Sequence, residues 1–164
     1  IMQHLVEQLS ALLMNKNMML VTAESCTGGL LATTLTHGAG ASKFYERGFI
    51  TYSNSAKHEA LGVPEETIEK YGAVSAQVAE LMAKGALENS HAHLSISITG
   101  IAGPDGGSAE KPVGLVFFGF ALSGGSAGSI EMHFKGTRNK IQSQATLNAI
   151  KHLITVLKDN PHEP

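Results

Sequence analysis

Ser25 and Lys57 are two residues of this sequence whose types suit nucleophilic chemistry. Ser25 lies between a run of apolar residues and the pair Gly28 and Gly29, a pattern typical of a turn from a strand into a helix. A serine in such a turn can attack a carbonyl carbon if a neighbouring base takes its proton. Lys57 could be that base if burial lowers its pKa, which is about 10.4 for a lysine in water. The two residues would then form a serine–lysine pair, a variant of the serine triad.

Ordinary structural roles are the simpler interpretation of each residue taken alone. A serine before a helix usually caps backbone amides, and a lysine on a helix usually points into water. Cys26 is a rival nucleophile, because a helix N-terminus lowers the pKa of a thiol. A single free cysteine is, however, more often a small buried hydrophobic residue. The residue types alone therefore leave a serine enzyme, a cysteine enzyme and a non-catalytic turn open.

The backbone after the candidate serine is the first place where a substrate could bind. Free N–H groups at the start of the following helix, near Thr27, Gly28 and Gly29, would attract an oxyanion or a phosphate. Two polar residues follow the next predicted strand. Tyr52 could relay or orient the proton of the serine, and Asn54 could hold a ligand amide or cap the helix that it starts.

A long glycine-rich segment, residues 99–112, is a second candidate for binding a substrate. Loops of this length are usually functional or disordered, and Thr99, Gly100 and Gly103 could let this one wrap a ribose or a phosphate. It has neither the P-loop spacing nor a dinucleotide fingerprint. Arg138, at the start of the last predicted helix, could bind a phosphate with two hydrogen bonds or could simply be a solvated surface residue.

The histidines of the chain do not have the spacing of metal ligands. His91 and His93 lack carboxylate or cysteine neighbours, and the pair His58 and Glu59 is not followed by a second histidine at the spacing of zinc proteases. We therefore expect no metal ion, and chemistry by a serine and a lysine would need no organic cofactor.

The elements that must position these residues follow from the hydrophobic pattern. Apolar residues recur at helical spacing in the first segment and in the segment that Thr137 opens, while short apolar runs predict strands. Pro64 and Gly72 bracket a further helix, and Ser75 could cap the one after it. Strands are predicted at residues 18–23, 48–52, 94–98, 113–122 and 129–134, and further helices at residues 30–35 and 53–61.

Helices and strands alternate through the first two thirds of the chain, and a hairpin and a helix follow. This order predicts an α/β fold, a three-layer α/β/α sandwich with a mixed, mostly parallel sheet. In such sheets ligands bind at the carboxyl ends of the strands. The segments after the strands that end at residues 23, 52 and 98 are therefore expected to converge.

The composition indicates one globular domain, residues 1–164, whose last residues, 159–164, are expected to fray. A formal net charge of −2 argues against nonspecific binding of nucleic acid, and the sequence has no apolar run long enough for a membrane span. The single cysteine excludes an intramolecular disulfide, and no signal peptide is recognisable. We therefore expect a cytoplasmic location, with no nucleic-acid or membrane partner.

Several blocks of the sequence together resemble a known family, the C-terminal domain of the CinA competence/damage-inducible proteins. The blocks occur in the family's order and span nearly the whole chain, so they are more specific than any single motif. They are residues 22–29, residues 52–54 with Lys57, residues 72–75, residues 99–104 and residues 110–114.

The resemblance implies an activity, because standalone bacterial members of the family are nicotinamide-nucleotide amidases. It implies hydrolysis of nicotinamide mononucleotide to nicotinic acid mononucleotide and ammonia, a step in pyridine-nucleotide salvage. Ser25 would be the nucleophile, Lys57 its base and Tyr52 an assisting residue. The resemblance also implies a homodimer. A non-catalytic nucleotide-binding module, linked to competence or DNA damage, is the alternative, but binding alone does not need these three side chains together.

Overall fold

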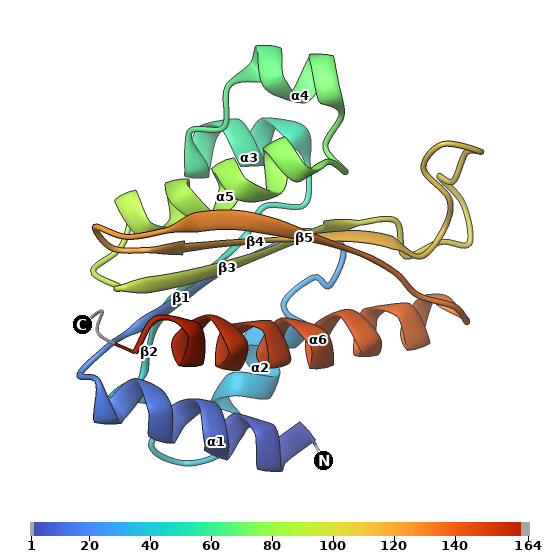
Figure 1. Ribbon diagram of the computed structural model, residues 1–164. Coiled ribbons are helices and arrows are strands. Elements are labelled where there is room, and N and C mark those ends of the chain that lie inside the picture. Colours follow the sequence, from blue (N-terminus) through green and yellow to red (C-terminus); the bar gives the residue numbers. More distant parts are fainter. Residues whose placement is uncertain (1, 162–164) are drawn as a thin grey trace.

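The computed structural model describes residues 2–161, which form a five-stranded sheet with helices on both faces (Figure 1). Helices α3, α4 and α5 cover one face, and α6, α2 and α1 cover the other, with α1 outermost in this view. The strands are β1 (Leu20–Glu24), β2 (Tyr45–Ile50), β3 (Leu94–Gly100), β4 (Leu115–Leu122) and β5 (Ala127–His133). The helices are α1 (Met2–Asn15), α2 (Leu30–Thr36), α3 (Asn54–Leu61), α4 (Glu65–Tyr71), α5 (Ala76–Glu88), α6 (Arg138–Asp159) and the short 3-10 turn η1 (Ala41–Lys43).

The strand order in the sheet is β2-β1-β3-β4-β5. The neighbours β2, β1 and β3 are parallel, whereas β4 is antiparallel to both β3 and β5. Four of the five strands therefore run in one direction and β4 alone runs in the other. This arrangement confirms the predicted three-layer α/β/α sandwich with a mixed sheet. The carboxyl ends of β2, β1 and β3 meet at one edge, as the argument from sequence requires.

The two central strands are buried on both faces, which explains their nearly continuous runs of small and apolar residues. In β1, Val21 and Ala23 join the cluster beneath α3 and α5, while Leu20 joins the larger cluster around α1 and α6. In β3 the residues facing α5 are polar: Ser95 Oγ donates to the carbonyl of Ala83 at 2.7 Å, and other side chains of this face do the same. These hydroxyls let α5 lie close to the sheet without leaving a buried polar atom unpaired.

Glycine sets the distance between α3 and α5. A Cβ atom on Gly85 of α5 would lie 1.9 Å from the carbonyl oxygen of Leu61, the last residue of α3. Because atoms cannot approach so closely, only glycine permits this contact. Helix α3, which carries Lys57, therefore rests directly on the backbone of α5.

The helix boundaries largely follow the predicted signals. Ser75 caps α5 by accepting a hydrogen bond from the amide of Val78 at 3.2 Å, as predicted. Helix α4 begins after Pro64 and ends at Gly72, also as predicted. The prediction for β2 was three residues late at its start, because Tyr45 begins an edge strand whose polar residues hide the strand pattern.

At the end of the chain, α6 extends to Asp159, and Lys16 Nζ donates to the carbonyl of Pro161 at 2.9 Å. The rest of the segment predicted to fray, residues 162–164, lies outside the described residues. Within residues 2–161, every helix is too short or too polar to cross a bilayer.

Candidate active site

Three segments that follow parallel strands enclose a cavity of about 270 Å³ at the carboxyl edge of the sheet. They are the turn after β1, the segment between β2 and α3, and the loop after β3, and the start of α6 closes the fourth side. The expected convergence of these segments is therefore observed. Of the residues that the sequence singled out, the cavity is lined by Ser25, Tyr52, Asn54, Lys57, Thr99, Gly100, Gly103 and Arg138.

Ser25 and Lys57 are in hydrogen-bond contact at the bottom of this cavity. Lys57 Nζ lies 3.1 Å from Ser25 Oγ. The lysine is 1% exposed and the serine 8% exposed. The amide of Ser25 donates to the carbonyl of Ile98 in β3 at 2.9 Å, which fixes the serine backbone to the sheet. Neither residue has the ordinary role that was the simpler interpretation, since the lysine is not solvated and the serine does not cap α2.

The remaining contacts of Lys57 are two backbone carbonyls. Nζ donates to the oxygen of Tyr52 at 3.2 Å and lies 3.5 Å from the oxygen of Ser53. No carboxylate of the described residues forms an ion pair with it. Burial therefore lowers the pKa of Lys57, because removing water disfavours the charged amine. A neutral amine could keep two N–H bonds to the carbonyls and direct its lone pair at Ser25.

Cys26 lines the same cavity but has the opposite protonation preference. The thiol is buried, and burial raises its pKa to about 12. A thiolate is the nucleophilic form of cysteine, so this environment suppresses its reactivity near neutral pH. The expected effect of a helix N-terminus on this thiol is outweighed by desolvation. The geometry thus favours the serine over the cysteine.

The start of α2 is occupied by a carboxylate of the protein itself. Glu24, at the end of β1, accepts hydrogen bonds from the hydroxyl of Thr27 at 2.6 Å and from the amides of Gly29 at 3.2 Å, Leu31 at 3.0 Å and Ala32 at 3.0 Å. The side chain of Thr27 and the amide of Gly29 thus face Glu24 rather than the cavity. Sequence reasoning missed Glu24, although a lone carboxylate at the end of a buried apolar run was a signal.

The turn between β1 and α2 is fixed at several further points. The amide of Gly28 donates to the carbonyl of Ser25 at 3.0 Å, and Gln142 of α6 donates to the carbonyl of Cys26 at 2.9 Å. Gly28 has a φ of 57°, in the left-handed region that favours glycine. Among the described residues, the amides of Cys26 and Thr27 find no acceptor, so these are the turn's free donors beside the serine.

Arg138 connects the two walls of the cavity. Its Nη1 donates to the carbonyl of Gly103 at 2.7 Å, and its Nη2 donates to the hydroxyl of Tyr52 at 2.9 Å. Tyr52 is 59% exposed, and its hydroxyl has no hydrogen bond to Ser25 or Lys57. The group of Tyr52 that contacts those two residues is its carbonyl oxygen, a contact that the sequence could not indicate.

Close packing explains part of the glycine pattern after β3. A Cβ on Gly100 would lie 2.8 Å from the carbonyl oxygen of Leu115 in β4, and one on Gly103 would lie 2.5 Å from Val113. The hydroxyl of Thr99 donates to the carbonyl of Ala73 at 2.9 Å, which ties β3 to the segment before α5. These residues therefore line the cavity and also hold its wall in place.

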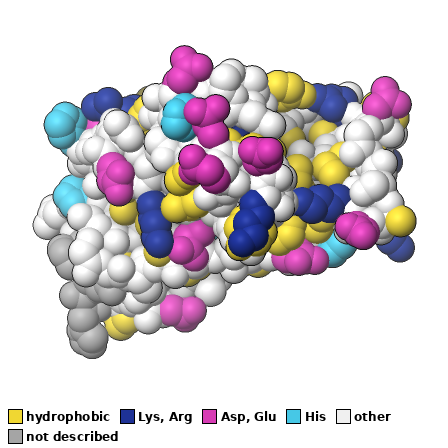
Figure 2. Space-filling model, turned by 90° about the horizontal axis from the view of Figure 1, so that it is seen from above, with side chains coloured by type: hydrophobic (Ala, Val, Ile, Leu, Met, Phe, Trp, Pro, Cys, Tyr) yellow, Lys and Arg dark blue, Asp and Glu magenta, His cyan; other side chains and the backbone are white. Residues whose placement is uncertain are grey.

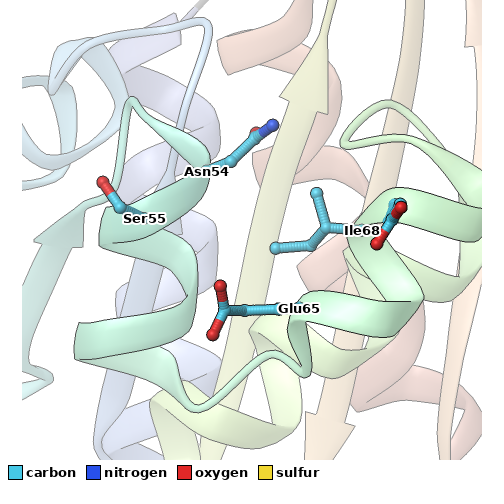
Figure 3. Close-up of a pocket in the computed structure, with 5 residues that line it drawn as sticks. Asn54, Ser55, Glu65 and Ile68 are labelled. Carbon is cyan, nitrogen blue, oxygen red and sulfur yellow. The ribbon is translucent and has the colours of Figure 1, made fainter.

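A second hollow, of about 390 Å³, lies between α3 and α4 and shares Asn54 with the cavity (Figure 3). Ser53, not Asn54, caps α3, by accepting from the amide of Ala56 at 3.0 Å. The amide group of Asn54 is thereby left for a ligand. Glu65 and Glu69 line the second hollow, and Figure 2 shows that acidic side chains gather on this face of the molecule. Ser25 and Lys57 lie in the other cavity.

Within residues 2–161, no three histidine, cysteine or carboxylate side chains are grouped so that they could hold a metal ion.

Comparison with known proteins adds the family to this geometry. The sequence model of the CinA C-terminal domain matches residues 2–157. The chain belongs to this family. Solved CinA-type structures have the same fold: a competence/damage inducible protein from Agrobacterium tumefaciens is 44% identical, with a TM-score of 0.92 and coverage of 96% of this chain and 95% of that one. A CinA superfamily protein from Escherichia coli is 38% identical, with a TM-score of 0.90 and coverage of 95% and 90%.

Among the relatives of this CinA domain, two lengths occur. The nicotinamide-nucleotide amidohydrolase PncC of Enterobacter agglomerans is 50% identical over 93% of this chain and 91% of its own length. The corresponding protein of Escherichia coli is 47% identical, over 93% and 92%. A putative competence-damage inducible protein of Caldicellulosiruptor bescii is 48% identical over 93% of this chain, but the chain spans only 38% of its length.

Proposed function

We propose that this protein is a nicotinamide mononucleotide amidohydrolase, which releases nicotinic acid mononucleotide and ammonia in pyridine-nucleotide salvage. The observation that carries the proposal is the buried Lys57 amine 3.1 Å from Ser25 Oγ, in a cavity lined by polar groups. Relatives named for this activity match the chain along nearly their whole length, which supports the same substrate.

The reaction begins with attack of Ser25 Oγ on the carboxamide carbon. Lys57, as a neutral amine, accepts the serine proton as the new C–O bond forms. The tetrahedral intermediate carries a negative oxygen, and the free amides of Cys26 and Thr27, the two residues after the serine, are its proposed donors. The ammonium of Lys57 then returns the proton to the leaving nitrogen, so that ammonia departs and an acyl-serine remains.

Water completes the reaction by hydrolysing the acyl-serine, with water as the attacking group and Ser25 as the leaving group. Lys57 takes a proton from the water as its oxygen attacks the acyl carbon, and returns it to Ser25 as the ester bond breaks. The products are a carboxylic acid and the free serine. The backbone carbonyls of Tyr52 and Ser53 hold Nζ of Lys57 in place throughout.

The other lining residues would bind the nucleotide. Arg138 offers a guanidinium at the mouth of the cavity, and Asn54 offers an uncommitted amide. Thr99, Gly100 and Gly103 form the wall against which the sugar or phosphate would lie. Gly28 and Gly29 act in this proposal through the shape of the turn, and Thr27 acts through its free amide. No metal ion or organic cofactor enters any step.

We also propose a homodimer as the working form. Ile50 of the edge strand β2 and Leu30 at the start of α2 are exposed apolar side chains that a second copy could cover. Light scattering on purified protein tests this part directly: a monomer mass at micromolar concentration contradicts it.

The experiment that tests the activity is ammonia release from nicotinamide mononucleotide in the presence of a chelator, with Lys57→Ala measured in parallel. Release by the unaltered protein that collapses in the variant supports the proposal. Absence of release from a sample that still binds the nucleotide contradicts it and favours the non-catalytic binding module.

A further inference from the structure

Glu24 is a buried charged group that the proposed reaction does not use as an acid, base or nucleophile. It is the last residue of β1, directly before Ser25, and is 0% exposed. Its neighbours in β2 and β3 are Ile50 and Ile98, which offer no counter-charge. A buried carboxylate without a cation partner is costly unless hydrogen bonds replace its lost water. Hydrogen bonds must therefore satisfy the Glu24 carboxylate.

The carboxylate of Glu24 is satisfied entirely by the start of α2. Oε1 accepts three hydrogen bonds, from the Thr27 hydroxyl and the amides of Gly29 and Leu31. Oε2 accepts one from the amide of Ala32 at 3.0 Å. An ionised carboxylate can only accept, so these four donors match its charged form.

Helix α2 depends on this arrangement, because it has no cap of its own. Its N-cap residue is Gly29, which has a φ of 103° and no side chain. Two consecutive left-handed glycines, Gly28 and Gly29, would otherwise leave the turn loose and three helix amides unpaired in a partly buried place. Glu24, at the end of the preceding strand, takes the place of the missing cap. Its hydrogen bonds connect the residue before Ser25 to the helix that follows Ser25.

We propose that Glu24 is a positioning residue for the nucleophile. By binding the amides of α2, it fixes the turn so that Ser25 faces Lys57 and only the amides of Cys26 and Thr27 remain free for the developing oxyanion. It also removes the start of α2 as a place for the substrate phosphate. This inference rests on the proposed role of Ser25 as nucleophile.

A fluorophosphonate probe tests the inference without using the nucleotide, because it reacts with an activated serine and is detected by intact mass. We compare the labelling rate of Ser25 in the unaltered protein, in Glu24→Gln and in Ser95→Ala. Gln keeps the shape of Glu and one acceptor oxygen, which can replace Oε1. Its NH2 group, in the place of Oε2, cannot accept the hydrogen bond from the amide of Ala32. Ser95→Ala is the matched control, because it removes a buried hydrogen bond at the opposite end of β3 and leaves the cavity intact.

The expected result is labelling slowed by about 10² in Glu24→Gln, similar to the loss of one oxyanion donor. Ser95→Ala should label at the unaltered rate even if its thermal stability falls by as much as that of Glu24→Gln. If Glu24→Gln does not fold, Thr27→Val removes only the shortest of the four bonds and should slow labelling by about tenfold, the factor that the loss of one such hydrogen bond can cost.

Two results overturn the inference: a Glu24→Gln or Thr27→Val protein that labels at the unaltered rate, or a loss of labelling that follows stability equally in Ser95→Ala. Failure of the proposed function has a different signature. Unaltered protein that labels at Ser25 but releases no ammonia contradicts the substrate and leaves the role of Glu24 measurable. Unaltered protein that does not label at all contradicts Ser25 as nucleophile and the role of Glu24 with it.

Discussion

Lys57 Nζ lies 3.1 Å from Ser25 Oγ, although the two residues are 32 positions apart in the chain. The serine follows β1, a strand of the sheet, and the lysine is on α3, whose last residue, Leu61, joins the buried cluster over that strand. Burial lowers the pKa of this lysine. The other acceptor near the Ser25 hydroxyl, the carbonyl of Tyr52, lies at the longer distance of 3.4 Å.

Replacement of Lys57 by alanine should lower kcat by about 10³ or more, because general-base catalysis contributes about 10²–10⁴ and, among the described residues, Lys57 is the one basic side chain hydrogen-bonded to Ser25 Oγ. Ammonia release under saturating nucleotide measures this. Lys151→Ala, which removes an exposed lysine of α6, is the control and should leave kcat unchanged. A fully active Lys57→Ala protein would mean that another group is the base.

The activity should rise with pH on its acidic side. Only the neutral amine of Lys57 can accept the serine proton, and burial lowers the pKa of that amine, so the active form gains population as pH rises through this lowered value. The pH profile of kcat/KM should therefore climb to a plateau below the ordinary pKa of lysine. A profile that falls as pH rises from neutral would contradict the assignment.

Lys57→Met should stabilise the protein at neutral pH by about 1 kcal/mol, as substitutions at strained functional positions often do. The sign follows from the lowered pKa: the unfolded chain binds the lysine proton more tightly than the folded one, so this residue opposes folding wherever it is charged. The penalty should shrink as pH rises through the folded pKa toward the ordinary value. Urea denaturation at two pH values measures both effects, and a destabilised Lys57→Met protein at neutral pH contradicts the prediction.

Ser25→Ala should abolish turnover, whereas Cys26→Ala should retain at least about half of it. Burial raises the pKa of the Cys26 thiol to about 12, so the thiolate is scarce at neutral pH. Steady-state rates of the two variants, with folding checked by circular dichroism, separate the two nucleophiles. The reverse pattern would establish a cysteine enzyme.

Tyr52→Phe and Arg138→Ala should raise KM more than they lower kcat. Tyr52 contacts Ser25 and Lys57 through its backbone carbonyl, which phenylalanine keeps, and its hydroxyl instead accepts from Arg138 at 2.9 Å. The double variant should cost less than the sum of the two single variants, because they share this bond. A large loss of kcat in Tyr52→Phe would instead support the proton relay that the sequence suggested.

Much of the fold was predictable because its signals are local. The cap at Ser75, the start of α4 after Pro64 and the buried strands all follow from short patterns of residue type. The convergence of three loops followed from one rule about parallel sheets. The start of β2 did not, because an edge strand with polar residues lacks the alternation on which strand prediction depends.

The site was predictable in its residue types but not in their partners. Ser25 and Lys57 could be singled out, yet the carbonyls that hold the lysine belong to the backbone and have no signature in the sequence. The glycines after Ser25 suggested an open anion site, whereas Glu24 fills it from the preceding strand. The Glu24 carboxylate reaches these amides across a turn. Composition alone does not reveal whether the amides at the start of a helix already bind a side chain of the protein.

The contact of Gly85 with Leu61 has a consequence for the tolerance of this protein to mutation. A single methyl group at Gly85 would push α3 off α5, and the displacement would be transmitted along α3 to the lysine amine. A shift of about 1 Å in a reacting group can cost about 10² in rate. In a deep mutational scan scored by growth on the nucleotide, Gly85 should therefore rank with Ser25, although it lies outside the cavity.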